Sequence, residues 1–287
     1  MGSMVLRVWD VEHGACAMLH DLSNGKAGRL AMIDSGSKAD WRPSTFIKTS
    51  LGRDCLDYLF ITNADQDHLS DLQGLWDEDI DVKTLTRNPH PPVEELRKIK
   101  AAGGTSNDIE RFLLMHASYN QPVTEPFNDH MGGITRKTFH NNFPEFKDTN
   151  NLSCAVFFEF GGFKILFPGD LEEAGWKALL KRQDFVDELA GVTVLVASHH
   201  GRENGYCKEV FNHCKPRAIV ISDKSIVHDT QKMTPTYRQR VVDNWPNGVN
   251  VATTRKQRHV LTTRRDGWIQ FEVEANGNFT ITTEKQG

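Results

Sequence analysis

A dense group of polar side chains follows directly on a short apolar run near residue 60. The apolar run, residues 59–61, is typical of the end of a buried strand, and Asn63, Asp65, Asp67 and His68 come immediately after it. Carboxylates at alternate positions beside an imidazole offer more ligand atoms from one tight loop than a solvated turn needs. This pattern indicates a metal site.

The same residues also allow a purely structural interpretation. Asp67 could cap the helix that is predicted over residues 69–76, because aspartate is a favoured residue immediately before a helix. From this stretch alone, a metal site and an acidic cap stay open as alternatives. The decision depends on what accompanies the stretch elsewhere in the chain.

Five other segments accompany it, and together they resemble one known family. The loop after residue 61 looks like the HxHxDH motif of the metallo-β-lactamase superfamily, in the HxDxDH form found in the hydrolase domain of ComEC-type competence proteins. The other segments are, in chain order, 8–14 (VWDVEHG), 32–36 (MIDSG), 150–153 (NNLS), 167–170 (FPGD) and 198–201 (SHHG). Each segment alone is a weak signal, but their common order is specific.

This resemblance extends from about residue 5 to the strands near residue 273, and it implies a fold and a metal centre. The implied fold is an α/β protein built as an αββα four-layer sandwich, in a single domain over residues 4–287. The implied cofactors are two divalent ions, Zn²⁺ or Mn²⁺, with Mg²⁺ as the alternative. The ligands expected for the first ion are Asp67, His68, Asp170 and His200. Those expected for the second are Asp65, Asp170, Asn63 and Asn150.

The resemblance also suggests catalytic roles. Asp67 would both bind metal and orient the attacking water, and His199 would contact the substrate or the transition state. Adjacent histidines on one loop point in different directions, so the opposite assignment, with His199 and not His200 on the metal, stays open. A histidine that follows a later strand in the family suggests that His228 reaches the rim of the site.

Asn63 departs from the family pattern, which usually has a histidine there. An amide oxygen binds divalent ions more weakly than an imidazole does, so an Asn63→His exchange is expected to tighten the second ion and to raise hydrolysis. Three explanations stay open: adaptation to an oxygen-preferring ion, an inactive relative, or an engineered exchange. Residues 1–3 ahead of Met4 resemble a cloning remnant, which makes laboratory alteration credible.

Composition bounds the class of protein. The chain has 287 residues, of which 38% are hydrophobic and 25% are charged, so it can bury a substantial core. No apolar run approaches the ~20 residues that cross a bilayer, and the N-terminus lacks the features of a signal peptide. We therefore expect no membrane association and a cytoplasmic location. Five cysteines without CxxC spacing indicate neither a disulfide framework nor a zinc ribbon.

The charge pattern bears on the partner. A net charge of −4 argues against nonspecific coating of nucleic acid, which relies on many contacts between cations and phosphates. It leaves room for a local basic groove. Arginines and lysines gather at residues 255–258 and 264–265, on what reads as two neighbouring strands, although a solvated β-face is the alternative. The candidate substrate-binding residues are Lys224, Arg255, Lys256 and Arg258.

Hydrophobic patterning predicts the elements that must position these residues. Strands are predicted over 5–11, 16–19, 30–33, 57–61, 155–159, 164–167, 192–197, 218–222, 249–253, 259–263 and 268–273. Helices are predicted over 93–102, 107–119, 172–180 and 236–244. His13 falls in the turn after the first strand, where we favour a role in capping the turn over one in the site.

Residues 88–138 form a predicted insertion, because prolines break the pattern and two helices follow. We expect this insertion to act as a lid or wall that shapes substrate access without supplying metal ligands. Its loop over 121–133 is rich in Pro, Asn and Gly, and loops of this length are often functional or mobile. Changing that loop is expected to alter substrate preference more than metal content.

Three functions are compatible with the sequence. The favoured one is a metal-dependent phosphodiesterase, a nuclease acting on DNA through a metal-activated water, with a role such as defence against foreign DNA. Relatives of the same fold hydrolyse other bonds, so a small-molecule esterase or cyclic-nucleotide hydrolase is a second reading. If Asn63 is natural and disabling, the chain would be a catalytically silent subunit that binds a protein partner. The oligomeric state is open.

Overall fold

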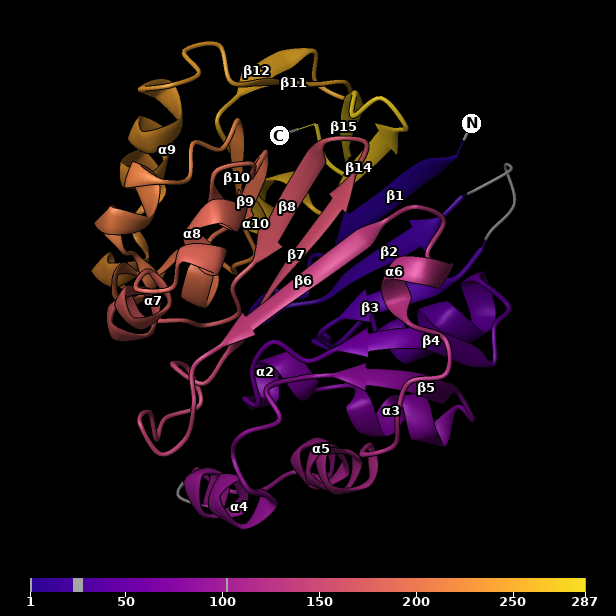
Figure 1. The fold of residues 1–287 in the computed structure, drawn as a ribbon. Helices are drawn as coiled ribbons and strands as arrows, with labels where there is room; N and C mark the ends of the chain where they lie inside the picture. Colours follow the sequence, from indigo (N-terminus) through magenta and orange to yellow (C-terminus); the bar gives the residue numbers. More distant parts are fainter. Residues whose placement is uncertain (1, 23–27, 102, 287) are drawn as a thin grey trace.

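The computed structural model describes residues 2–22, 28–101 and 103–286, and within these ranges two β-sheets face each other with helices on both outer sides (Figure 1). This is the predicted αββα sandwich, and the α/β fold class is confirmed. Met1, the first residue of the predicted remnant, and Gly287, the last residue of the predicted domain, lie outside the described residues. Ala102, which ends a predicted helix, also lies outside them.

The first sheet has the order β12-β11-β15-β14-β1-β2-β3-β4-β5. Its strands are β1 (Ser3–Val8), β2 (Ala17–Asp21), β3 (Leu30–Ile33), β4 (Cys55–Phe60), β5 (Asp81–Thr86), β11 (Val249–Val251), β12 (Lys256–Arg258), β14 (Ile269–Glu274) and β15 (Phe279–Thr283). The strands β3, β4 and β5 run parallel. Parallel strands are covered on both faces, which explains why β4 is buried along most of its length.

The second sheet has the order β13-β10-β9-β8-β7-β6. Its strands are β6 (Thr135–His140), β7 (Cys154–Phe160), β8 (Phe163–Phe167), β9 (Val194–Val196), β10 (Ala218–Ile221) and β13 (Val260–Thr262). The strands predicted over 155–159 and 164–167 form the hairpin of β7 and β8, with Gly161 and Gly162 at φ 60° and 94° in its turn. Two successive positive φ values favour glycine, so the sequence marks this turn.

Helices and short helical turns fill the connections. In the first half they are α1 (Pro43–Thr45), η2 (Phe46–Ser50), α2 (Gln66–Leu69), α3 (Leu72–Asp77), α4 (Val93–Ala101), α5 (Asn107–Ser118) and α6 (Phe127–His130). In the second half they are α7 (Glu173–Leu179), α8 (Gln183–Leu189), η3 (Ser198–Gly201), η4 (Glu203–Gly205), η5 (Lys208–Asn212), η6 (Asp229–Gln231), α9 (Thr234–Val242) and α10 (Thr263–Asp266). No helix in the described part of the chain is long and apolar enough to cross a membrane.

Three apolar clusters hold these layers together. The central one lies between the sheets, where the rings of Phe60, Phe127 and Phe158 meet. A second cluster packs α3 and α5 on the outer face of the first sheet, and a third packs α7, α8 and α9 on the second sheet. Burial of these faces fixes how the strand ends meet.

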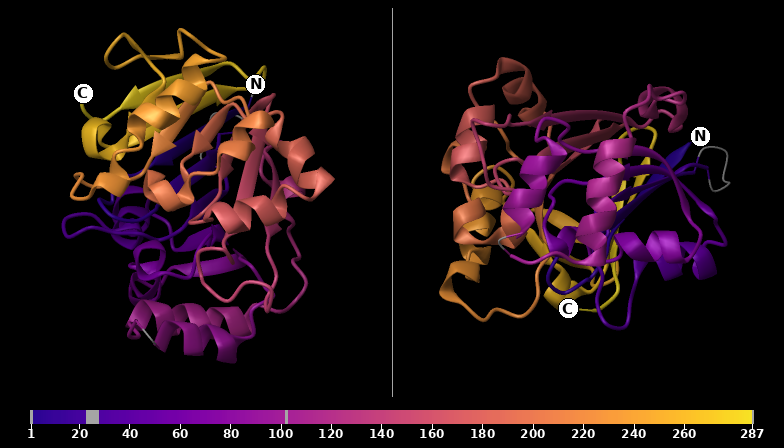
Figure 2. Two further views of the ribbon diagram at one scale, coloured as in Figure 1. Left: turned by 90° about the vertical axis from the view of Figure 1, so that its left-hand side faces the viewer. Right: turned by 90° about the horizontal axis from the view of Figure 1, so that it is seen from below.

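The helices of the predicted insertion belong to this outer layer. Figure 2 shows α4 and α5 side by side along one end of the sandwich. Ser106 caps α5, because its hydroxyl accepts a hydrogen bond from the Ile109 amide. Ile109 and Phe112 are buried against the first sheet's cluster. Residues 135–138, which we had placed in the insertion, form part of β6 instead.

Part of the 121–133 loop packs on the core, and its expected role in shaping substrate access stays a prediction. Within it, α6 places Phe127 in the central core, and the Tyr58 hydroxyl donates to the backbone oxygen of Glu125 at 2.9 Å. Arg29 also pairs with the Glu125 carboxylate at 2.6 Å. These contacts hold the loop over the interior of β4, away from the polar loop that follows the end of that strand.

Candidate metal centre

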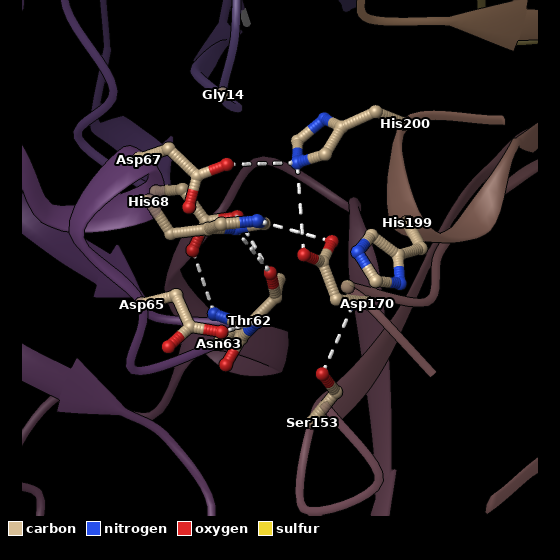
Figure 3. A network of polar contacts seen from close by, with 12 residues as sticks. Gly14, Thr62, Asn63, Asp65, Asp67, His68, Ser153, Asp170, His199 and His200 are labelled. Carbon is tan, nitrogen blue, oxygen red and sulfur yellow. Dashed lines mark hydrogen bonds and ion pairs between the residues drawn. The ribbon is translucent and has the colours of Figure 1, made fainter. Parts of the chain in front are cut away.

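Four of the predicted ligands meet at one edge of the sandwich. Asp67 and His68 lie on α2 after β4, Asp170 lies in the turn after β8, and His200 lies on η3 after β9. One ligand atom from each residue lies within 4.8 Å of those of the other three. His68 Nε2 is 3.1 Å from Asp170 Oδ1, and His200 Nε2 is 3.1 Å from Asp67 Oδ2 (Figure 3).

A buried carboxylate orients His68. Its Nδ1 lies 2.9 Å from Asp34 Oδ2, and Asp34 is itself fixed by a hydrogen bond of 2.7 Å from the Thr62 backbone amide. Because Asp34 accepts this contact, the Nδ1 proton of His68 points to Asp34 and Nε2 faces Asp170. Such a carboxylate behind a histidine is a common support for a metal ligand.

A backbone carbonyl orients His200. The Ser222 oxygen accepts from His200 Nδ1 at 3.1 Å, which leaves Nε2 as the free ring nitrogen. That Nε2 is buried and makes no hydrogen bond within the described residues, although Asp67 and Asp170 are beside it. A buried ring nitrogen that faces two carboxylates without a hydrogen bond to either is costly, and a metal ion bound between them would satisfy it.

The protonation of the cluster fits a cation. Burial lowers the pKa of His200, but Asp170 and Asp67 offset this effect and raise the pKa to about 9. Burial raises the pKa of Asp170, yet the charges of His68 and His200 hold it well below its usual range. The site therefore favours positive charge between two ionised carboxylates. Two imidazoles and two carboxylates suit Zn²⁺ or Mn²⁺, so these residues fit the first predicted ion.

The expected second set of ligands is not assembled for an ion. Asp65 receives Thr149 Oγ1 at 3.0 Å on each oxygen and Asn63 Nδ2 at 3.0 Å, and it also contacts the Lys100 ammonium. Asn150 accepts from the same Asn63 amide at 3.3 Å. The prediction of a second oxygen-rich ion site therefore does not fit the residues present. Lys100, which the sequence did not single out, occupies its place.

The alternative interpretation, in which Asp67 caps a helix, does not hold. Asp67 lies within the first turn of α2, and Asp65 precedes the helix without a capping hydrogen bond from its side chain. Close backbone packing holds Asp67 instead. Gly14 has φ 133°, and a Cβ added there would lie 2.3 Å from the Asp67 backbone oxygen. The VWDVEHG segment thus approaches α2 where only glycine fits.

His13 faces the site, contrary to our preference for a turn cap. Its Nε2 lies 3.4 Å from Asp67 Oδ2 and 3.3 Å from an Arg202 nitrogen, and its ring centroid is 5.0 Å from that of His200. Burial, with the charge of His200, lowers the pKa of His13 to about 4, so the ring is neutral. The neighbouring Gly14 was the available signal that this turn packs closely on the site.

His199 lies beside the cluster and is directed away from His200. Both residues have positive φ, 49° and 55°, and their rings stand 6.3 Å apart at a steep angle. His199 Nδ1 is buried, 3.5 Å from Glu172 Oε1, and has no hydrogen bond among the described residues. Its contact with the substrate stays a prediction, whereas the geometry places His200 among the candidate ligands.

His228 is exposed and caps the turn η6, and its reach to the rim of the site stays a prediction. Several other predicted site residues lie elsewhere. Arg255 and Lys256 lie at β12, the edge strand at the opposite end of the first sheet from β4 and β5. Arg258 is paired with Asp266 at 3.1 Å. These three cations therefore do not line the metal centre.

The cations expected on two neighbouring strands are also separated. Arg264 and Arg265 lie on α10, and the guanidinium of Arg264 pairs with Asp223 at 3.0 Å. Lys224 is exposed and lies near the cluster, since its charge helps to lower the pKa of His13. Lys224 is thus the predicted cation that lies near the centre, together with Arg202, which we had not named.

A separate hollow of about 620 Å³ borders β4, β5 and the 121–125 segment. Its cations are already matched, because Lys83 pairs with Asp57 at 3.1 Å and Arg29 pairs with Glu125. The hollow contains none of the four clustered ligands. The chemistry is therefore concentrated at the ends of β4, β8 and β9, which form the candidate active site.

Comparison with known proteins agrees with the resemblance seen in the motifs. The chain is 27% identical over 240 residues to ComE operon protein 3 of Bacillus subtilis, covering 81% of this chain and 27% of that protein. It thus spans about a quarter of the length of this relative. The resemblance to ComEC-type proteins is confirmed by this match. No protein-family model matches the chain.

Solved structures of similar shape include metallo-β-lactamase fold proteins. The YhfI protein of Bacillus subtilis, described as having that fold, is 11% identical with a TM-score of 0.46 over 96% of this chain and 99% of its own. A diphosphatase of the PhnP family is 12% identical with a TM-score of 0.42 over 94% of this chain and 97% of its own.

Proposed function

We propose that this protein is a metal-dependent hydrolase that cleaves phosphodiester bonds, with DNA as its substrate class. The observation that carries the proposal is the free, buried Nε2 of His200 beside Asp67 and Asp170, with His68 completing the set. These residues would hold a divalent ion. The bound ion would act as a Lewis acid and lower the pKa of a coordinated water, which supplies a nucleophile near neutral pH.

The chain's own side chains divide the remaining tasks. Of the two carboxylates in the cluster, Asp67 is the more exposed, so it can orient the attacking water and accept its proton. The neutral His13 ring, 3.4 Å from that carboxylate, can relay this proton to solvent. His68 and His200 are locked from behind and serve to hold the ion.

Positive side chains support a phosphodiester over a neutral ester. Arg202 lies against His13, and the charge of Lys224 reaches the same ring, so both are placed to meet phosphate oxygens. His199 borders Asp170 on the other side and can contact the leaving group. The ComEC-like motifs add weight to this reading, while the basic residues at β12 do not.

The test compares wild type with Asp170→Asn in hydrolysis of bis-p-nitrophenyl phosphate and of single- and double-stranded DNA, each with Mn²⁺, Zn²⁺ or Mg²⁺. Asparagine keeps the size of the side chain but removes its charge, so we expect at least a hundredfold loss of rate and loss of bound metal. Asp184→Asn is the matched control, because Asp184 is exposed and pairs with Arg182.

Three outcomes would overturn the proposal. The first is phosphodiester cleavage that persists after chelation or in Asp170→Asn. The second is cleavage confined to carboxylic esters, which would make the protein a small-molecule esterase. The third is tight DNA binding with a loaded metal and no turnover, which would make it a silent binding subunit.

A further inference from the structure

The position expected for a second metal ion is occupied by a lysine from α4. Lys100 lies in the last turn of that helix, and its ammonium contacts Asp65 Oδ1. The side chain is 13% exposed, so most of its length is covered. A lysine side chain loses rotamer freedom when it is covered, and this ion pair with Asp65 offsets that loss.

The carboxylate of Asp65 is already largely occupied. Its Oδ1 receives Lys100 and Thr149, and its Oδ2 receives Thr149 and Asn63. A carboxylate offers about four lone-pair positions, and three donors, with the Thr149 hydroxyl shared between both oxygens, occupy most of them. A metal ion at Asp65 would have to displace the lysine or the hydroxyl.

Asn63 is oriented against metal binding at this point. Its amide nitrogen lies between Asp65 Oδ2 and Asn150 Oδ1, which are both acceptors, so the nitrogen and not the oxygen must face them. An amide nitrogen is not a metal ligand. Asn63 Oδ1 is therefore directed away from Asp65, and it has no hydrogen bond within the described residues.

Charge leads to the same conclusion. One divalent ion neutralises the two carboxylates Asp67 and Asp170, and the Lys100 ammonium neutralises Asp65. A second divalent ion that bound Asp65 would leave the Lys100 ammonium without its partner at close range. Like charges at such a distance repel strongly in a partly buried site. The negative charges of these three carboxylates are thus balanced by one divalent ion and one ammonium.

We propose that this protein binds one metal ion and that Lys100 permanently takes the place of the second. Asn63 is then part of the same adaptation, because its amide can donate to Asp65 beside the lysine where a histidine would compete for an ion. This inference rests on the metal site of the proposed function, but the metal count is measured without substrate, so the two can fail separately.

The experiment measures Mn²⁺ stoichiometry by elemental analysis after equilibrium dialysis, together with electron paramagnetic resonance of the loaded protein. Wild type is expected to bind one equivalent and to show the spectrum of an isolated ion. The double variant Asn63→His/Lys100→Met, which restores an imidazole and removes the cation, is expected to bind two equivalents and to show spin coupling between neighbouring ions. Asn63→His alone is expected to stay near one equivalent.

Lys98→Met is the matched control, because Lys98 lies on the same helix, is 71% exposed and pairs with Glu95. It should leave the count at one. Circular dichroism confirms that each variant folds. Two coupled ions in wild type would overturn the inference, and so would a double variant that is folded but still binds one. A wild type that binds no ion would instead overturn the metal site on which the proposed function depends.

Discussion

At the scale of single residues, the site depends on which nitrogen of each histidine is free. Asp34 and the Ser222 carbonyl accept the Nδ1 protons of His68 and His200, so both Nε2 atoms face the two carboxylates. The supporting groups are as important as the ligands, because a ring that could flip or change tautomer would lose its lone pair toward the ion. Thr62 extends this support by holding Asp34.

The first prediction at this scale concerns the pH dependence of the metal-free protein. The pKa of His200 is raised to about 9, so its protonated form stabilises the fold fully below about pH 6.5, and this contribution is lost as pH rises through 9. The free energy of unfolding of the metal-free protein should therefore fall between pH 6.5 and 9, by up to about 3 kcal/mol for this group.

Metal-loaded protein should behave in the opposite way, because a bound ion competes with that proton. The rise in Tm on adding Mn²⁺ or Zn²⁺ should grow as pH increases from 6 to 9. Thermal unfolding followed at several pH values, with and without chelator, measures both trends. A metal-induced shift that does not change with pH would contradict the ligand role of His200.

At the scale of elements, the centre exists because four connections meet at one edge of the sandwich. The ends of β4, β8 and β9 carry the ligands, and the turn after β1 packs on α2 from the other side. Ser222, which follows β10, links these parts, because its hydroxyl donates to Gly14 O at 2.8 Å while its carbonyl holds His200. A disturbance in the turn should therefore reach the ligands.

The prediction at this scale is that Gly14→Ala weakens metal binding. The added methyl would meet the Asp67 backbone oxygen at 2.3 Å, so either the turn or α2 must move. We expect at least a tenfold loss of metal affinity and a lower Tm. Isothermal titration with Mn²⁺ and thermal unfolding are the measurements.

Gly52→Ala is the control for this variant. Gly52 also has positive φ, 61°, but nothing lies within 4 Å of an added Cβ. It should cost about 1 kcal/mol of backbone strain and leave metal affinity unchanged. Equal metal affinity in both variants would show that the turn after β1 does not position Asp67.

At the scale of the whole molecule, the two sheets are held face to face by aromatic packing that the site does not share. Phe127 enters from α6 and meets Phe60 at 5.5 Å and Phe158 at 5.6 Å between ring centroids. Phe127 is only 2% exposed, although its segment has the sequence pattern of a loop. This segment therefore helps to join the two sheets.

The prediction for the whole molecule is that Phe127→Ala lowers stability more than it changes the site. Removing a buried phenylalanine from a packed core costs about 3–5 kcal/mol. Chemical denaturation should show that loss, while the metal stoichiometry of the folded fraction stays at the wild-type value. Leu114→Ala, at an exposed position, is the control and should be nearly neutral. Loss of bound metal without loss of stability would place α6 at the active site after all.

Much of the fold and the four residues of the candidate metal site could be predicted from the sequence because their signals are local. A buried strand that ends in polar residues can be recognised in the sequence without knowing its neighbours in the sheet. Such a strand precedes each of Asp67, His68, Asp170 and His200. The β7–β8 hairpin is equally local, since its turn requires positive φ at two glycines. The order of these segments resembles that of a known family, and this resemblance implied the sandwich.

Only the tertiary structure decided what surrounds the ligands. Lys100 reaches Asp65 because α4 packs against α5 and α5 against α2 and α3, and no spacing in the sequence encodes that chain of contacts. His13 meets Asp67 because the turn after β1 folds onto α2. Arg255 and Lys256 lie far off because sheet order, set by long-range pairing, puts β12 at the opposite edge. Local periodicity determines which residues form elements, whereas burial of their faces against distant partners determines which side chains meet.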